Sequence, residues 1–73
     1  MAAAIKFIRV YSSYGGELIH DIVYESGRLR MVFGTEIPQT ALKYKLEAEA
    51  KGQVKEQYDR YHGYEKIYGG GKK

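Results

Sequence analysis

The chain has 73 residues, of which 44% are hydrophobic, and it carries 12 Lys and Arg against 9 Asp and Glu, a formal charge of +3. A chain of this length buries only about 60% of the surface that its unfolded form exposes, so two domains, a deep catalytic cleft or an enclosed cofactor cavity are not expected. Because there is no Cys, disulfides, a thiol nucleophile and thiolate metal centres are excluded.

Residues 5–11, IKFIRVY, alternate apolar and cationic side chains and are rich in β-branched and aromatic types. This pattern predicts a strand with Ile5, Phe7 and Tyr11 on one side and Ile8 and Val10 on the other. The turn-forming residues 12–16 end it.

Residues 18–24 and 28–33 predict a hairpin with a two-residue turn at Ser26-Gly27, in which Gly27 supplies a positive φ. This register places Tyr24 opposite Leu29 and Ile22 opposite Met31. One face then gathers apolar residues: Leu18, Ile22, Tyr24, Leu29, Met31 and Phe33. The outer face would carry Asp21, Glu25, Arg28 and Arg30 with Ile19, Val23 and Val32.

Past Pro38 the composition changes to Ala, Leu, Lys and Glu, which predicts a helix from residue 39. Apolar residues spaced by three or four form one helical stripe: Leu42, Leu46, Ala50, Val54, Tyr58 and Tyr61. Gly52 is either an interior residue of this helix or a break between two helices. Residues 64–68 are either a short last strand or an arm.

These elements predict an α+β fold, in which a three-stranded antiparallel N-terminal sheet packs against one long or two short C-terminal helices. We expect one domain over residues 1–68, with residues 69–73, GGGKK, as a disordered tail. A core this thin is close to marginal stability, so we expect a homodimer. No stretch approaches the roughly 20 apolar residues that span a bilayer, which favours a cytoplasmic protein without a membrane partner.

Several landmarks follow one another in an order that resembles the small bacterial and phage KTSC-domain proteins. The resemblance covers residues 9–67, and the matching landmarks are Ser12-Ser13, Ile22-Val23-Tyr24, Leu29 to Phe33, Ile37-Pro38, Leu46 with Ala48, Gly52, and Tyr61 with Tyr64. The chain departs from the pattern where only Gly34-Thr35-Glu36 replaces an aromatic strand, and where Gln53-Val54-Lys55 replaces an aromatic-Phe-Asn step. The resemblance implies a fold more than a role, with a hint of association with nucleic-acid enzymes.

No residue pattern predicts catalysis, a cofactor or a metal. The two histidines, His20 and His62, lack zinc-type spacing and would need carboxylates such as Asp21 or Asp59 to hold a metal. We expect His20 to be a hydrogen-bonded residue at the margin of the core. Ser12 and Ser13 suit a turn, and no glycine-rich phosphate loop is present. We therefore expect a protein that is not an enzyme.

The least ordinary feature is the segment from Tyr58 to Tyr68, which holds four tyrosines and two cations in eleven residues. Such a patch can stack on bases and contact phosphates, anchor a protein interface, or simply complete the core. The candidate partner-binding residues are Arg28, Arg30, Tyr58, Arg60, Tyr61, His62, Tyr64 and Lys66. We predict a small binding module for an anionic partner, nucleic acid or nucleotide. The alternative is a phage-type or mobile-element-type inhibitor that contacts a host protein.

Overall fold

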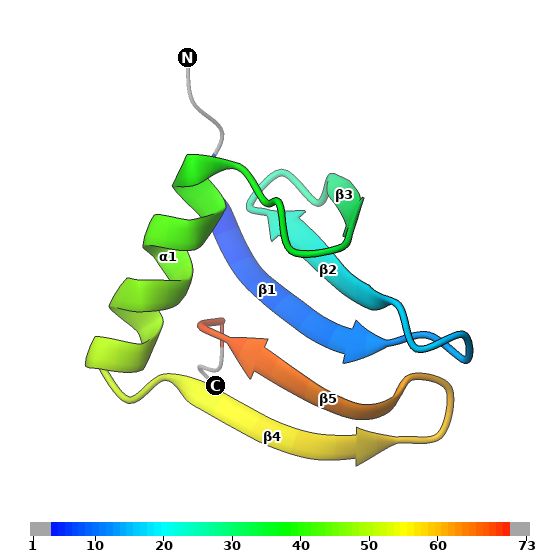
Figure 1. Ribbon diagram of the computed structural model, residues 1–73. Helices are drawn as coiled ribbons and strands as arrows, with labels where there is room; N and C mark the ends of the chain where they lie inside the picture. The colour runs from blue at the N-terminus through cyan, green and yellow to red at the C-terminus, as the bar shows by residue number, and fades with distance from the viewer. Residues whose placement is uncertain (1–3, 71–73) are drawn as a thin grey trace.

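The computed structural model describes residues 4–70. Five strands and one helix are found in this range, in the order β1 (Ile5–Ser12), β2 (Leu18–Tyr24), β3 (Leu29–Phe33), α1 (Gln39–Ala50), β4 (Val54–Asp59) and β5 (Gly63–Tyr68). The strands form one antiparallel sheet in the order β3-β2-β1-β5-β4, and α1 lies across one end of one face (Figure 1). Residues 71–73 of the predicted tail lie outside the described range.

The predicted architecture of three N-terminal strands and C-terminal helices is therefore wrong. The fold is α+β, but its helix is central in the sequence and the chain returns to the sheet as a second hairpin, β4–β5. In the sheet, β5 pairs with β1, so the first and last strands are neighbours. Between residues 4 and 70, no helix is both long and apolar enough to cross a membrane.

The helix ends at Ala50, and Gly52 is the break between the helix and the next strand, which resolves the question that the sequence left open. Gly52 has a φ of 71°, a left-handed conformation that is costly for residues with a Cβ. The Gln53 N–H donates to the Ala48 carbonyl and the Gly52 N–H donates to the Glu49 carbonyl, at 2.8 and 3.1 Å. These two bonds form a Schellman motif, which closes the last turn and turns the chain away from the helix axis.

The spacing of Val54 and Tyr58 explains why the sequence pattern was misleading. Four residues are about one turn of a helix, but four is also an even number of steps along a strand, so both structures place these residues on one side. With the helix stopped at Gly52, the β-branched and aromatic side chains of residues 54–58 favour the extended conformation.

The core lies between α1 and the sheet and is centred on Ile8, Ile22 and Tyr68, with Ala41 and Ala48 from the helix. The predicted helical stripe does not form this core, because Leu42, Leu46, Tyr58 and Tyr61 are exposed. The helix instead turns its two small alanines to the sheet, which lets its backbone approach closely. Tyr44 adds a hydrogen bond at the edge of this contact, from its hydroxyl to the Lys6 carbonyl at 2.7 Å.

The β2–β3 hairpin has a register one residue away from the predicted one. Ile22 faces Arg30 and Val23 faces Leu29, because the loop holds three residues rather than two. The Tyr24 backbone N–H donates to the Arg28 carbonyl. Gly27, with a φ of 93°, occupies the left-handed position of this loop type. A one-residue slip exchanges the two faces of a strand, so the predicted apolar face is wrong. Leu29, Met31 and Phe33 lie on the face of the sheet that points away from the core. Arg30 lies on the same face as the core residue Ile22.

A similar local shift corrects the first strand. The pairing of β1 with β2 slips between Ile5 and Phe7, and Ile5 packs against the core together with Ile8. Ile5 therefore does not share a side with Phe7 and Tyr11, as the simple alternation predicts, because a bulge adds one residue to one strand of the pair.

Candidate functional site

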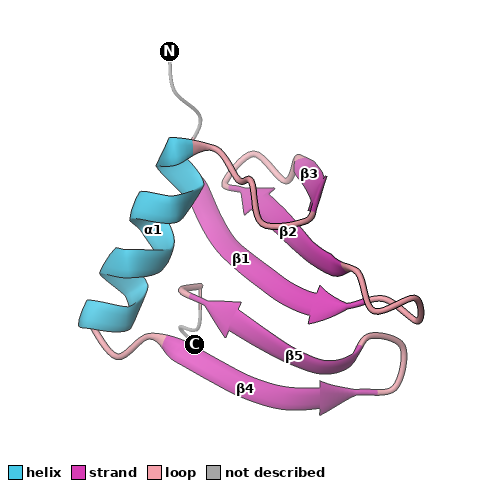
Figure 2. Cartoon of the chain, viewed as in Figure 1, coloured by secondary structure: helices cyan, strands magenta, loops and turns pink. Residues whose placement is uncertain are grey.

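The sheet has two unlike faces. The face that packs on α1, here called the helix face, carries Ile8, Ile22 and Tyr68. The opposite face, here called the open face, has no helix over it anywhere in residues 4–70 (Figure 2). Because side chains alternate along a strand, the register assigns each strand residue to one of these faces.

Three of the candidate binding residues lie together on the helix face, at the end of the β4–β5 hairpin far from α1. Tyr58 faces Tyr64 across the two strands, and Lys66 follows on the same side. Both rings are open to solvent, with Tyr58 79% and Tyr64 61% exposed. Arg60 and Tyr61 are also exposed, in the adjoining turn. We call Tyr58, Tyr64 and Lys66 the tyrosine surface.

Polar contacts hold part of the tyrosine surface in place. The Tyr64 hydroxyl donates to the Glu56 carboxylate, and this bond raises the pKa of Tyr64 above its ordinary value. The Lys66 ammonium lies 3.8 Å from the same carboxylate and 5.8 Å from the centre of the Tyr68 ring. An exposed pair of this kind contributes little to stability, so Lys66 can exchange Glu56 for another anion at low cost.

The two remaining cationic candidates, Arg28 and Arg30, lie elsewhere. Arg28 is in the β2–β3 loop and Arg30 is on β3, an edge strand. Four inter-strand steps separate β3 from β4, a distance of about 19 Å at about 4.8 Å per step. The structure thus does not join these arginines to the tyrosine surface.

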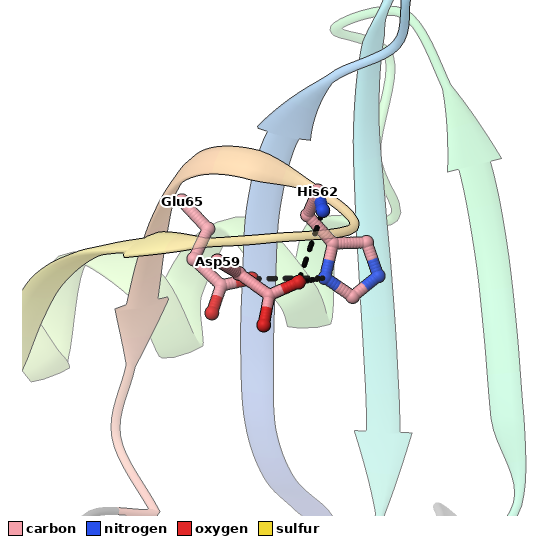
Figure 3. Close-up of side chains that lie close together, drawn as sticks. All are labelled: Asp59, His62 and Glu65. Atoms are coloured by element: carbon pink, nitrogen blue, oxygen red, sulfur yellow. Dashed lines mark hydrogen bonds and ion pairs between the residues drawn. The ribbon is translucent and has the colours of Figure 1, made fainter.

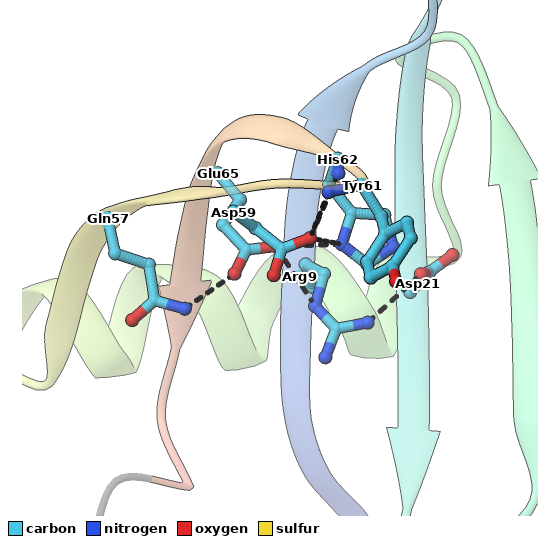
Figure 4. A network of polar contacts seen from close by, with 7 residues as sticks. All are labelled: Arg9, Asp21, Gln57, Asp59, Tyr61, His62 and Glu65. Carbon is cyan, nitrogen blue, oxygen red and sulfur yellow. Dashed lines mark hydrogen bonds and ion pairs between the residues drawn. The ribbon is translucent and has the colours of Figure 1, made fainter.

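The last candidate, His62, turns to the open face and joins a group of ionisable residues there. We call this group the charge network; it consists of Arg9, Asp21, Asp59, His62 and Glu65 (Figure 4). The Arg9 guanidinium lies 3.5 Å from the Asp21 carboxylate and 3.4 Å from the Glu65 carboxylate. Both acids are almost fully buried, so Arg9 is the cation that compensates them.

Neighbouring side chains fix the geometry of the charge network. Gln57 donates its amide to the second oxygen of Glu65 at 2.6 Å. The Tyr11 ring packs against the His62 ring with a centroid separation of 4.5 Å. Burial, together with the Asp21 carboxylate, raises the pKa of Tyr11. The side chains of β1, β4 and β5 that meet here are therefore oriented by contacts on several sides.

The turn between β4 and β5 brings Asp59, His62 and Glu65 together at intervals of three residues (Figure 3). One Asp59 carboxylate oxygen accepts the backbone N–H groups of Tyr61 and His62 at 2.9 and 3.0 Å. These two bonds are the main reason that the pKa of Asp59 lies below its ordinary value. The same oxygen is 3.0 Å from the His62 Nδ1 atom, and a Glu65 oxygen is 3.2 Å from it.

His20 lies apart from this group, on the helix face; the sequence predicted a hydrogen-bonded residue at the margin of the core, and the side chain is buried. Its Nε2 atom is 3.1 Å from the Lys45 ammonium of α1. Burial lowers the pKa of His20, and the positive charge of Lys45 lowers it further. Burial also lowers the pKa of Lys45. The neutral imidazole thus accepts a hydrogen bond from Lys45, which links the helix to β2.

The sequence analysis named Asp21 and Asp59 as carboxylates that could join a histidine at a metal, but it missed Arg9 and Glu65 and the convergence of all five residues of the charge network. Its signal is present in the sequence: Asp59, His62 and Glu65 are three residues apart around Gly63, and they converge if the chain forms a hairpin there. The prediction of a helix through Tyr61 hid this signal. Comparison of the chain with family models, with curated proteins and with solved structures finds no match. The KTSC resemblance stays a prediction.

Proposed function

We propose that the chain is a small binding module whose tyrosine surface stacks on the unpaired bases of a single-stranded nucleic acid. The observation that carries the proposal is the Tyr58–Tyr64 pair, two exposed aromatic rings that face each other across a hairpin. A solvent-exposed aromatic pair on a sheet gives stacking platforms for successive bases, worth about 1–3 kcal/mol for each base. The pair lies beyond the reach of α1, so it is accessible.

The charges around the pair favour an anionic ligand. Of the charged residues on the hairpin, Lys55, Arg60 and Lys66 are cations, and Glu56, Asp59 and Glu65 are anions. Asp59 and Glu65, however, are engaged in the charge network on the open face. Glu56 alone among these acids therefore lies on the helix face beside the tyrosines. Lys66 lies on the same face as the two rings and Arg60 is exposed in the adjoining turn, so both cations are available for phosphate contacts.

Fluorescence anisotropy with short single-stranded RNA and DNA oligonucleotides tests the proposal. Replacing Tyr58 or Tyr64 with Ala is expected to weaken binding about 5- to 150-fold, the loss of about 1–3 kcal/mol of stacking. Raising the salt from about 50 to about 200 mM should weaken binding several-fold, because the contacts release counterions. Tyr14, a fully exposed tyrosine in the β1–β2 loop, provides the matched control.

Tyr14→Ala should leave the affinity unchanged. This result would distinguish binding by the Tyr58–Tyr64 pair from nonspecific binding through any exposed tyrosine. The Arg60→Ala variant should reduce the dependence on salt, because it removes one phosphate contact. The proposal would be contradicted if the wild type and both the Tyr58 and Tyr64 variants bind with equal affinity. It would also be contradicted if the affinity does not depend on the salt concentration.

A second candidate function, contact with a protein, is favoured by a different observation. Three alternate residues of the edge strand β3 face the open side and remain about half exposed: Leu29 53%, Met31 46% and Phe33 55%. An apolar strip on an unpaired edge strand favours pairing with another strand, for example β3 of a second copy. This arrangement would suit the homodimer and the inhibitor that the sequence analysis considered.

Light scattering during size-exclusion chromatography tests the contact between copies. If β3 pairs with its copy, the wild type elutes with the mass of a dimer, and Met31→Lys elutes with the mass of a monomer, since a charge on the strip opposes pairing. A wild type that elutes with the mass of a monomer would contradict the homodimer. Capture of a host protein after nuclease treatment, lost in Met31→Lys, would then support an inhibitor in place of the dimer.

A further inference from the structure

We propose that Asp59, His62 and Glu65 form a binding site for one first-row divalent metal ion, with Zn²⁺ as the reference ion. The three side chains converge on the open face at the β4–β5 turn (Figure 3). The site lies on the opposite side of the sheet from the Tyr58–Tyr64 pair, so it is independent of the proposed nucleic-acid function.

The spacing of the donor atoms suits such an ion. Zinc binds histidine nitrogen and carboxylate oxygen at about 2.0–2.2 Å, which places neighbouring ligand atoms about 3.0 Å apart in an octahedral site and about 3.4 Å apart in a tetrahedral one. The His62 Nδ1 atom is 3.0 Å from the Asp59 oxygen and 3.2 Å from the Glu65 oxygen. All three donor atoms lie within 4.8 Å of one another.

A second observation concerns the hydrogen bonds that these donors lack. Glu65 is 3% exposed, and its Oε1 atom, which points to His62, makes no hydrogen bond among the described residues; the Arg9 Nε atom lies 3.4 Å from it, in a long ion pair. The His62 Nδ1 atom is likewise buried and makes no hydrogen bond within residues 4–70, although two carboxylate oxygens are in range. Buried polar atoms are nearly always satisfied, and a metal ion between them would satisfy both.

The charge of the surroundings also favours a divalent cation. In the charge network Arg9 is one cation among three carboxylates, those of Asp21, Asp59 and Glu65. The formal charges of these three carboxylates and Arg9 sum to −2, which a divalent ion would balance. Gln57, which donates to the other Glu65 oxygen, supplies an outer hydrogen bond of the kind that orients metal ligands.

The imidazole donor decides which ion fits. Carboxylate oxygens alone suit Mg²⁺ and Ca²⁺, whereas a nitrogen donor with two carboxylates suits Zn²⁺ or Mn²⁺. Three protein ligands leave further coordination positions for water. The bound ion would tie both ends of the 60–62 turn together, because Asp59 belongs to β4 and Glu65 to β5.

Isothermal titration of the tag-free, chelator-treated chain with ZnCl₂ tests the site. We expect one Zn²⁺ for each chain and at least tenfold weaker binding in His62→Ala and in Glu65→Gln. The Glu49→Gln variant, which removes an exposed carboxylate on α1, is the matched control and should bind as the wild type does. If Glu65→Gln fails to fold by circular dichroism, Asp59→Asn replaces it.

A second readout locates the ion. Addition of Zn²⁺ should shift the backbone amide resonances of residues 59–65 in an NMR spectrum, and Tyr58→Ala should leave Zn²⁺ affinity unchanged. The proposal is overturned if the wild type shows no saturable binding of Zn²⁺ at one ion per chain, or if His62→Ala binds it as tightly as the wild type. Neither result would bear on the stacking of bases.

Discussion

Replacement of Arg9 with Met is expected to lower the free energy of unfolding by about 3–5 kcal/mol, the range found when a buried ion pair loses one partner. Arg9 is the cation between Asp21 and Glu65, two side chains that are each 3% exposed. Met retains much of the length and volume of the side chain, so the loss arises from two buried carboxylates without a counter-charge. Urea unfolding followed by circular dichroism measures it.

A matched arginine and a compensating change make this result specific. Arg30→Met alters an exposed arginine on the edge strand β3 and should change the stability by less than about 0.5 kcal/mol. If Arg9→Met does not fold, adding Asp21→Leu should restore part of the stability, since removing a buried charge with its partner is often nearly neutral. An Arg9 variant as stable as the Arg30 variant would show that the network does not compensate buried charge.

The second large effect is expected in the core. Ile22→Ala should destabilise the chain by about 2–5 kcal/mol, because it removes three carbon atoms from a side chain with no solvent exposure and leaves a cavity between β2 and α1. Domains of this size are stable by only about 4–11 kcal/mol. The change should therefore lower the midpoint of thermal unfolding markedly, which calorimetry measures directly.

Leu46→Ala is the control for the core, and it discriminates between the two views of the helix. The sequence pattern placed Leu46 in the buried stripe, whereas the structure leaves it 57% exposed. We expect Leu46→Ala to change stability by less than about 1 kcal/mol. A loss for Leu46→Ala that equals the loss for Ile22→Ala would mean that α1 packs through its leucines and that the described core is wrong.

The sequence predicted the N-terminal half of the fold well. The three strands, their antiparallel order and the start of the helix follow from the alternation of residues 5–11, the turn at Gly27 and the change of composition after Pro38. The register of the β2–β3 hairpin was missed because two- and three-residue loops both use a glycine with positive φ; the hydrogen bond from the Tyr24 backbone N–H to the Arg28 carbonyl distinguishes them.

The prediction for the C-terminal half was wrong because the spacing of its apolar residues was ambiguous. A spacing of four fits both a helix turn and a strand, so the run through Val54 and Tyr58 did not discriminate between them. The deciding information was at Gly52, whose left-handed conformation, together with the hydrogen bonds that the Gly52 and Gln53 N–H groups donate to helix carbonyls, closes the last helical turn. The pairing of β4 with β5 and of β5 with β1 then completes the sheet.

The candidate site was predicted in part. The register brings Tyr58, Tyr64 and Lys66 onto one surface, as the density of tyrosines had suggested, but for a different geometric reason. Arg28 and Arg30 cannot be grouped with them by sequence, because their position relative to the C-terminal hairpin depends on β5 pairing with β1. The charge network depends on the same pairing, since Arg9 of β1 meets Glu65 of β5 through it.

NMR titration of the labelled chain with a single-stranded oligonucleotide is the most direct test of the proposed binding surface. The largest shifts are expected on Tyr58, Tyr64 and Lys66 and on the turn that contains Arg60, while residues of β3 and of α1 should change little. Shifts confined to β3, or no shifts at saturating oligonucleotide, would contradict it.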